Sequence, residues 1–286
     1  MTKKRFITLL CAILVILAVF TGCASAAQGK SKLQEILDRG RLIVGTGSGN
    51  VPSHFMDETG ELVGFDIEMA RILADALFGD PSKVEFVEES PDSRIPNLLT
   101  DKVDIVIQFM TITGPRAQQV TFSTPYYIEG LGLVMPTNGK YKTYDEMAAA
   151  IAKGEKVVIS ALQNVFIDGF VQKLLPGSVC EQYETQALSY QAMDSGRSHG
   201  ACTDLSSAMW MAKNQPEKYI HSGIAVVPQA YGAAMRHDDQ IWINFVNTVF
   251  LDAMTGTGYE QYHDAYEKWF GVKLELPKMG RPSYYD

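Results

Sequence analysis

The sequence predicts an α/β fold of two lobes joined by two hinge strands. Short apolar strands alternate with amphipathic helices, which is typical of a mainly parallel sheet covered by helices. The alternation begins near Leu42 and starts again near Gly132. Two extended, glycine-punctuated segments, residues 125–132 and 226–232, bracket the second series. A chain that leaves one lobe, builds the other and returns needs two such connections as a hinge.

The first series of elements is predicted from apolar periodicity. Residues 65–77 form a helix, because one of its faces carries Ile67, Ala70, Ala74 and Leu77. A short helix is expected at residues 94–99, and strands are expected at residues 42–46, 84–87 and 104–109.

The second series repeats this pattern. Strands are expected at residues 132–135, 156–160, 179–183 and 200–203, with helices at residues 144–152, 165–175, 186–195 and 205–213. The C-terminal part is expected to be helical. Its aromatic side chains are interpreted as core and not as a ligand cage; they are Trp242, Phe245, Phe250, Tyr262, Tyr266 and Trp269.

The N-terminus is typical of an export signal. Three cations at residues 3–5 precede an uncharged apolar run at residues 6–20, which is too short to span a bilayer. A permanent anchor is the alternative. Residues 20–23 resemble a lipobox, which makes Cys23 the lipidated first residue of the mature chain, whereas residues 24–26 fit ordinary signal cleavage. The lipoprotein is favoured, with residues 1–22 as the signal peptide.

Composition excludes several classes of protein. The 286 residues carry a formal net charge of -8, and removing residues 1–22 takes away three cations and no anion. A nucleic-acid partner is therefore not expected. The five His are scattered without ligand spacing, so neither a metal site nor a cofactor is expected.

Two cysteines, Cys180 and Cys202, remain in the mature chain besides Cys23, because Cys11 lies in the signal. They fall in two different predicted strands. The sequence leaves a disulfide between them open, and burial as small hydrophobes is favoured.

Two motifs invite an enzymatic interpretation. Residues 196–200 match G-x-S-x-G, but a nucleophile elbow needs strand, turn, helix, and here the order is helix, turn, strand. Residues 45–49 resemble a dinucleotide loop, but Asn50 stands where a third glycine is required.

A carboxylate receptor is predicted after the strand of residues 104–109. A polar turn with Thr111 and Thr113 opens a short helix that carries Arg116. Such a turn lies at the carboxyl edge of a parallel sheet, where open α/β sheets place ligands. The guanidinium offers a planar, two-pronged donor that matches a carboxylate. A surface arginine beside a helix cap is the alternative.

A second polar edge ends the strand of residues 200–203. Thr203 and Asp204 precede a helix, and Asp204 alone would be interpreted as the N-cap of that helix. In a cleft opposite Arg116, however, its carboxylate would suit a ligand ammonium. The two charges together would specify an α-amino acid.

These residues resemble a known family over almost the whole mature chain. The matching segments are residues 42–46, 64–67, 94–96, 103–105, 110–113, 116, 122–126, 196–197, 204, 231–232 and 268–271. The chain is similar to the bacterial extracellular solute-binding proteins of family 3, the polar amino-acid receptors of ABC importers. The resemblance implies a periplasmic-binding-protein type II fold that closes over its ligand. It also implies that Arg116, Thr111 and Thr113 hold the α-carboxylate and that Asp204 holds the α-ammonium.

Departures from the family pattern bear on specificity. Gln163 and Asn164 stand where members often carry Gly-Thr, and Asn164 is expected to donate through its amide. Phe109 is expected to form an apolar wall, and Ser48 and Asn50 complete the expected contacts together with Thr203. The pocket is interpreted as short of charge for the ligand's side chain, which favours a neutral or unusual ligand.

The resemblance implies an extracytoplasmic, monomeric substrate-binding component with an ABC permease as its membrane partner, and not an enzyme. Lobe one is expected at residues 23–126 and 231–286, and lobe two at residues 127–230. Three alternatives stay open: a sensor that reports its ligand to a signalling receptor, a cyclohexadienyl-dehydratase-like enzyme, and a relative that binds nothing.

Overall fold

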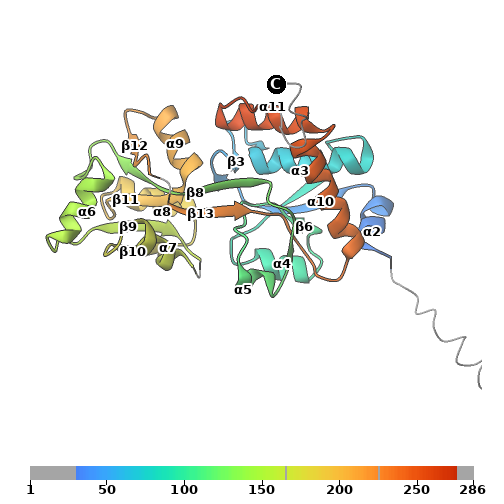
Figure 1. Ribbon diagram of the computed structural model, residues 1–286, viewed down its shortest axis with the longest axis horizontal. Coiled ribbons are helices and arrows are strands. Elements are labelled where there is room, and N and C mark those ends of the chain that lie inside the picture. The colour runs from blue at the N-terminus through green and yellow to red at the C-terminus, as the bar shows by residue number, and fades with distance from the viewer. Residues whose placement is uncertain (1–29, 165, 225, 276–286) are drawn as a thin grey trace, which may run out of the picture.

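Two sheets organise the chain into two α/β lobes that lie side by side (Figure 1). The computed structural model describes residues 30–164, 166–224 and 226–275, so the expected signal peptide and Cys23 lie outside the described residues. Lobe one is built around a five-stranded sheet, and lobe two around a six-stranded sheet. None of the helices in the described ranges is long and apolar enough to cross a membrane.

The sheet of lobe one has the order β5-β1-β6-β14-β7. Its strands are β1 (Leu42–Thr46), β5 (Val84–Glu88), β6 (Ile105–Val106), β7 (Thr121–Phe122) and β14 (Ala234–Met235). The pairs of β1 with β5 and β6 are parallel, whereas β14 pairs antiparallel with β6 and β7. Its helices are α2 (Lys32–Arg39), α3 (Phe65–Phe78), α4 (Arg94–Leu99), α5 (Gly114–Ala117), α10 (Gln240–Thr255) and α11 (Tyr259–Phe270).

Two features of lobe one differ from the sequence expectation. The strand expected at residues 104–109 is reduced to β6, because the backbone leaves the sheet before Phe109, whose φ is 36°. A small three-stranded sheet was not foreseen; it consists of β2 (Gly49–Asn50), β3 (His54–Met56) and β4 (Leu62–Val63).

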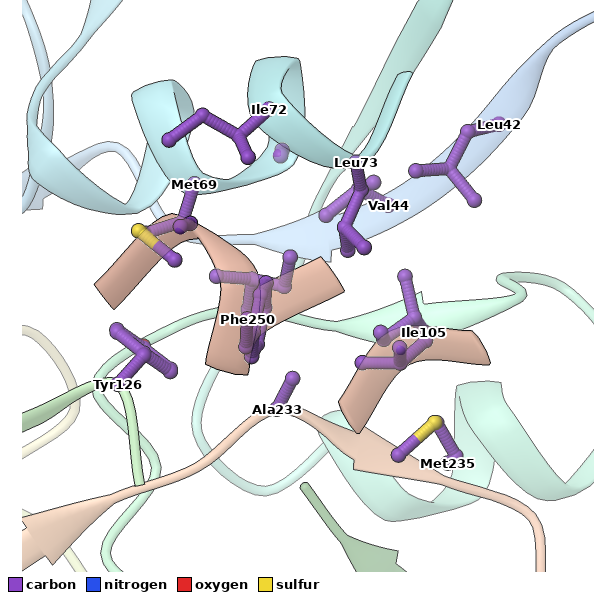
Figure 2. Packing of buried hydrophobic residues seen from close by; sticks show 14 of the residues in the cluster. Leu42, Val44, Met69, Ile72, Leu73, Ile105, Tyr126, Ala233, Met235 and Phe250 are labelled. Carbon is purple, nitrogen blue, oxygen red and sulfur yellow. The ribbon is translucent and has the colours of Figure 1, made fainter. Parts of the chain in front are cut away.

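The main core of lobe one lies where α3 and α10 pack against the sheet. Figure 2 shows Phe250 of α10 among Leu73, Tyr126 and Ala233, all of them buried. The aromatic residues expected as core belong to this cluster: Trp242, Phe250 and Tyr262 are fully or almost fully buried, and Phe245, Tyr266 and Trp269 pack against them. The prediction of core and not cage is confirmed for this group.

The sheet of lobe two has the order β10-β9-β11-β8-β12, with β13 also paired to β8. Its strands are β8 (Tyr127–Pro136), β9 (Val158–Leu162), β10 (Val179–Tyr183), β11 (Gly200–Asp204), β12 (Tyr219–His221) and β13 (Val226–Tyr231). Its helices are α6 (Tyr144–Ala152), α7 (Ile167–Leu174), α8 (Gln186–Asp194) and α9 (Leu205–Asn214). Cys180 on β10 and Cys202 on β11 lie on the two strands that neighbour β9, and both are free thiols.

Strands β8 and β13 run antiparallel between the lobes, as Figure 1 shows. Their pairing extends from Tyr127 opposite Tyr231 to Gly130 opposite Pro228. A β-bulge follows at Val227, whose φ is 56°. The two extended segments predicted as a hinge therefore form one two-stranded ribbon.

Candidate functional site: a cavity between the lobes

A cavity of about 100 Å³ lies between the two lobes. A buried water needs roughly 10–15 Å³ of such space, so the cavity has room for a small ligand. Both lobes and the second hinge strand line it, with Asn50, His54, Pro91, Arg94, Gln108, Phe109, Thr111 and Arg116 from lobe one, Leu131, Leu162, Asn164, Ile167, Phe170, Gln186, Cys202, Thr203 and Asp204 from lobe two, and Gln229 and Tyr231 from β13.

Most of the ligand contacts predicted from the sequence meet in this cavity. Its lining includes Asn50, Phe109, Thr111, Arg116, Asn164, Thr203 and Asp204. Two predicted residues do not line it. Ser48 donates its hydroxyl to Glu88 at the end of β5, away from the cavity. Thr113 occupies the N-cap position of α5, and its buried hydroxyl has no hydrogen-bond partner within the described structure.

The Arg116 guanidinium faces the cavity from lobe one. Gly114 and Pro115 start the four-residue helix α5, and Nη1 of Arg116 donates to the carbonyl of Thr111 at 2.8 Å. The guanidinium carbon lies 5.5 Å from the ring centroid of Phe166, a residue of lobe two. Burial lowers the pKa of Arg116. No carboxylate of the described chain lies within 4.0 Å of this guanidinium.

The turn that precedes Arg116 is bonded directly to the hinge. Ile112 donates its N–H to Ala230 of β13 at 2.9 Å, and Thr111 bridges to Tyr231. The Thr111 hydroxyl also donates to the side-chain carbonyl of Gln229. The residues around Arg116 are therefore tied to β13 by backbone and side-chain hydrogen bonds.

Asp204 occupies the N-cap position of α9 but does not cap it. Its carboxylate accepts hydrogen bonds from the Tyr231 hydroxyl at 2.6 Å and from the Asn50 amide at 2.9 Å. Burial raises the pKa of Asp204. The N-cap interpretation of this side chain is wrong, because the carboxylate turns into the cavity.

Glu129 of β8 takes over the capping of α9. Its carboxylate accepts from the Ser206 N–H at 2.7 Å and from the Ser206 hydroxyl at 2.9 Å. A carboxylate is favourable at a helix N-terminus because it meets free N–H groups and the positive end of the helix dipole. Burial and the nearby charge of Asp204 raise the pKa of Glu129 to about 8.

Asn50 connects the two lobes across the cavity. It lies on β2 of lobe one, donates to Asp204 and accepts from the Ser207 hydroxyl of α9 at 2.9 Å. Its amide thus satisfies two polar groups of lobe two at once.

A buried carboxylate fixes the wall formed by Phe109. Asp66 of α3 accepts from the Phe109 N–H at 2.9 Å and from the Tyr126 hydroxyl at 2.6 Å, and it lies 2.7 Å from Nδ1 of His54. A positive φ is strained for a side chain as large as Phe, and these bonds hold it. The Phe109 ring packs against both Tyr231 and Tyr127, with ring centroids 4.6 Å and 5.2 Å away, and the two tyrosine rings lie 6.3 Å from each other.

Gly47 leaves room for two polar side chains of the cavity. A Cβ at this position would lie 2.6 Å from Nε2 of Gln108 and 2.8 Å from Cδ2 of His54. Any larger residue would displace both.

Several lining residues were not predicted as ligand contacts. Gln108 directly precedes Phe109, and Tyr231 and Gln229 fall in the second predicted hinge segment. Their positions in the sequence could therefore have indicated that they line the cavity. Arg94 was noted only as part of a family-like segment. His54 and Gln186 had no signal in the sequence, because only the tertiary fold brings them to the cavity. No group of three or more His, Cys, Asp or Glu that could hold a metal ion occurs in residues 30–164, 166–224 and 226–275.

Comparisons with known proteins agree with this architecture. A sequence profile of the bacterial extracellular solute-binding proteins, family 3, matches residues 42–272. A glutamine-binding protein of Geobacillus stearothermophilus is 29% identical over 252 residues, which cover 81% of this chain and 92% of that protein.

Two solved structures are similar over most of the chain. A mutant of ArgBP from T. maritima aligns with a TM-score of 0.71 at 28% identity, covering 84% of this chain and 100% of that chain. The ancestral amino acid-binding protein AncCDT-1, described as a precursor of cyclohexadienyl dehydratase, aligns with a TM-score of 0.72 at 32% identity, with the same two coverages.

Proposed function

The chain belongs to the bacterial extracellular solute-binding proteins of family 3, and from this premise we propose that it binds a polar amino acid between its lobes and passes it to an ABC importer. Its two α/β lobes joined by β8 and β13 are the periplasmic-binding-protein type II fold. One observation carries the proposal: Arg116 of lobe one and Asp204 of lobe two line the same cavity. An α-amino acid presents a carboxylate to the first and an ammonium to the second.

The carboxylate docks first on lobe one. Arg116 supplies charge-assisted hydrogen bonds, and Thr111 lies beside it in the lining. On lobe two, the side-chain carbonyl of Asn164 accepts from the Phe166 N–H at 2.9 Å, which orients the amide nitrogen of Asn164 as a further donor for the ligand.

The ammonium then engages Asp204 as lobe two closes. Asp204 is the acidic residue of the cavity lining, so the ammonium binds its carboxylate. The ammonium then replaces the Asn50 amide as a donor to Asp204. Each hydrogen bond to a charged group contributes about 1.5–3 kcal/mol, and exclusion of water on closure strengthens these contacts.

Titration calorimetry with the common amino acids tests the proposal, after the protein has been unfolded and refolded to remove carried-over ligand. Arg116→Ala is expected to weaken binding at least a hundredfold without unfolding the protein, whereas the exposed Arg197→Ala leaves it unchanged. Intact binding in Arg116→Ala would refute the assignment of the carboxylate receptor.

Delivery implies a permease partner and a location outside the cytoplasmic membrane. We place the protein there as a monomer, with residues 1–22 removed and a lipid on Cys23. The lobes divide as residues 23–126 and 231–286 against 127–230. Mass spectrometry of the mature N-terminus distinguishes lipidated Cys23 from cleavage after Ala26. Uptake of radiolabelled amino acid in cells with and without the protein tests delivery.

A catalytic role has one observation in its favour, the likeness to AncCDT-1. A dehydratase needs a proton donor in the cleft, and Asp204, whose pKa burial raises, is the carboxyl group in the cavity lining. We expect binding without turnover. Release of water and carbon dioxide from prephenate, followed by NMR, would establish the enzyme instead.

A further inference from the structure

We infer that the ligand carries a second anionic group in its side chain and that Arg94 recognises it, which makes the substrate an acidic amino acid of the size of aspartate or glutamate. The inference rests on the proposed function and narrows it. It revises the expectation of a neutral ligand. That expectation assumed that no charged residue of the pocket pairs with the ligand's side chain, because Arg94 was not placed in the pocket.

Arg94 is the first residue of α4, and its side chain turns into the protein. It lines the cavity together with Arg116, although the residue is only 7% exposed. Its Nε donates to the Pro91 carbonyl at 2.9 Å, and its Nη1 donates to the Gln108 carbonyl at 3.4 Å. Both acceptors are neutral. No carboxylate of the described chain lies within 4.0 Å of this guanidinium.

Two cations therefore face one small cavity. Burial, and then the charge of Arg116, lower the pKa of Arg94 to about 10, so it stays charged at neutral pH. A buried charge without a partner is costly, and two like charges add their mutual repulsion. A ligand with two anionic groups relieves both costs, whereas a ligand with one leaves the other guanidinium without an ion-pair partner in the cavity.

Glu89 and Asp92, whose charges act on Arg94, do not replace such a ligand, because neither lines the cavity. Glu89 accepts from the Asn97 amide at 2.9 Å, and its other oxygen is buried without a hydrogen-bond partner in the described residues. Burial raises the pKa of Glu89, against the Asn97 hydrogen bond and the charge of Arg94. Glu89 is absent from the cavity lining, so it partly offsets the charge of Arg94 from outside the cavity.

The rest of the lining fits a short acidic side chain. With Arg116 on the α-carboxylate and Asp204 on the α-ammonium, Arg94 remains for the third charge. Lobe two contributes Leu162, Ile167 and Phe170 to the lining, which suit an aliphatic stem of one or two carbons. A cavity of about 100 Å³ suits a ligand with a short side chain.

Calorimetry with isosteric pairs tests the inference: L-glutamate against L-glutamine, and L-aspartate against L-asparagine. In the unmodified protein the acidic member of at least one pair is expected to bind at least tenfold more tightly than its amide. In Arg94→Gln that ratio falls at least fivefold. The exposed Arg41→Gln, which loses only a surface ion pair with Glu85, keeps the ratio.

The outcomes separate the inference from the proposed function. Equal or tighter binding of the amides, or an unchanged ratio in Arg94→Gln, overturns the acidic ligand and leaves amino-acid binding in place. The same holds if another amino acid binds and none of these four does. If no amino acid binds, the proposed function itself fails. If Arg94→Gln does not fold, the preference of the unmodified protein decides alone.

Discussion

The hydroxyl of Tyr231 lies 2.6 Å from a carboxylate oxygen of Asp204. This bond joins the end of the second hinge strand to the residue from which α9 starts. It also holds the carboxylate in the cavity, away from the N–H groups of the helix that Asp204 would otherwise cap. The ligand-facing orientation of Asp204 is therefore set by the hinge as well as by lobe two.

Replacing Tyr231 by Phe is expected to lower the free energy of unfolding by about 1–3 kcal/mol, because a buried carboxylate loses a hydrogen-bond donor. The ring that stacks on Phe109 is kept. Urea unfolding measures the change. Tyr183→Phe is the control, since its hydroxyl bonds to Glu181 at the surface and its loss costs at most about 0.5 kcal/mol. Equal effects of the two substitutions would mean that the Tyr231 bond does not stabilise the fold.

Asn50→Ala is expected to open the lobes in the absence of ligand. It removes the bonds to Asp204 and Ser207 that connect lobe one to lobe two. Small-angle X-ray scattering should report a larger radius of gyration than for the unmodified protein. Asn244→Ala, an exposed substitution on α10, should leave the radius unchanged. A radius that stays the same in Asn50→Ala would show that other contacts hold the lobes together.

Gly47→Ala is expected to weaken amino-acid binding at least tenfold, about 1.4 kcal/mol. The added methyl group would collide with Gln108 and His54 in the cavity lining. Gly49→Ala, two residues along, meets no atom within 4 Å and should bind normally. Titration calorimetry on both variants checks this, and normal binding by Gly47→Ala would contradict it.

The buried Glu129 predicts a pH dependence of stability. Its pKa is about 8 in the folded chain, above the ordinary value of 4.5. A carboxyl group with a raised pKa stabilises the fold fully below its unfolded pKa, and this contribution is lost as the pH rises through its folded pKa.

The free energy of unfolding should therefore fall between about pH 5 and pH 8, by an amount on the order of a few kcal/mol. Glu129→Gln should flatten this fall, whereas the exposed Glu58→Gln should preserve it. Urea unfolding at intervals of one pH unit measures the slopes. Parallel slopes in Glu129→Gln and the unmodified protein would exclude Glu129 as their source.

Elements with local signals could be predicted from the sequence. Helix α6 and strand β10 begin and end where the apolar pattern placed them. In α6 the start is marked by Thr143, whose hydroxyl accepts from the Glu146 N–H as an N-cap. The strands β2, β3 and β4 could not be predicted, because two or three residues are too few for a period to be recognised.

The site likewise contains residues that could be predicted from the sequence and residues that could not. Arg116 and Asp204 were predicted because each follows a strand at the edge where ligands bind. Arg94 could not be assigned a role, since an arginine at the start of a short helix is ordinarily solvated, and only the packing of α4 buries it. The orientation of Asp204 depends on Glu129, which lies 75 positions earlier and takes over the cap. A local sequence pattern cannot reveal that a residue this far away caps α9 in place of Asp204.

The position of β14 has a consequence for how the chain assembles. This strand lies between β6 and β7, so the sheet of lobe one needs a strand from after the hinge, and its core needs α10. The strands of lobe two, from β8 to β13, are contiguous in sequence. A chain that emerges amino end first therefore presents a complete lobe-two sheet while lobe one still lacks β14 and α10. Lobe two can thus become native first, whereas β7 has no neighbour in the sheet of lobe one until β14 follows.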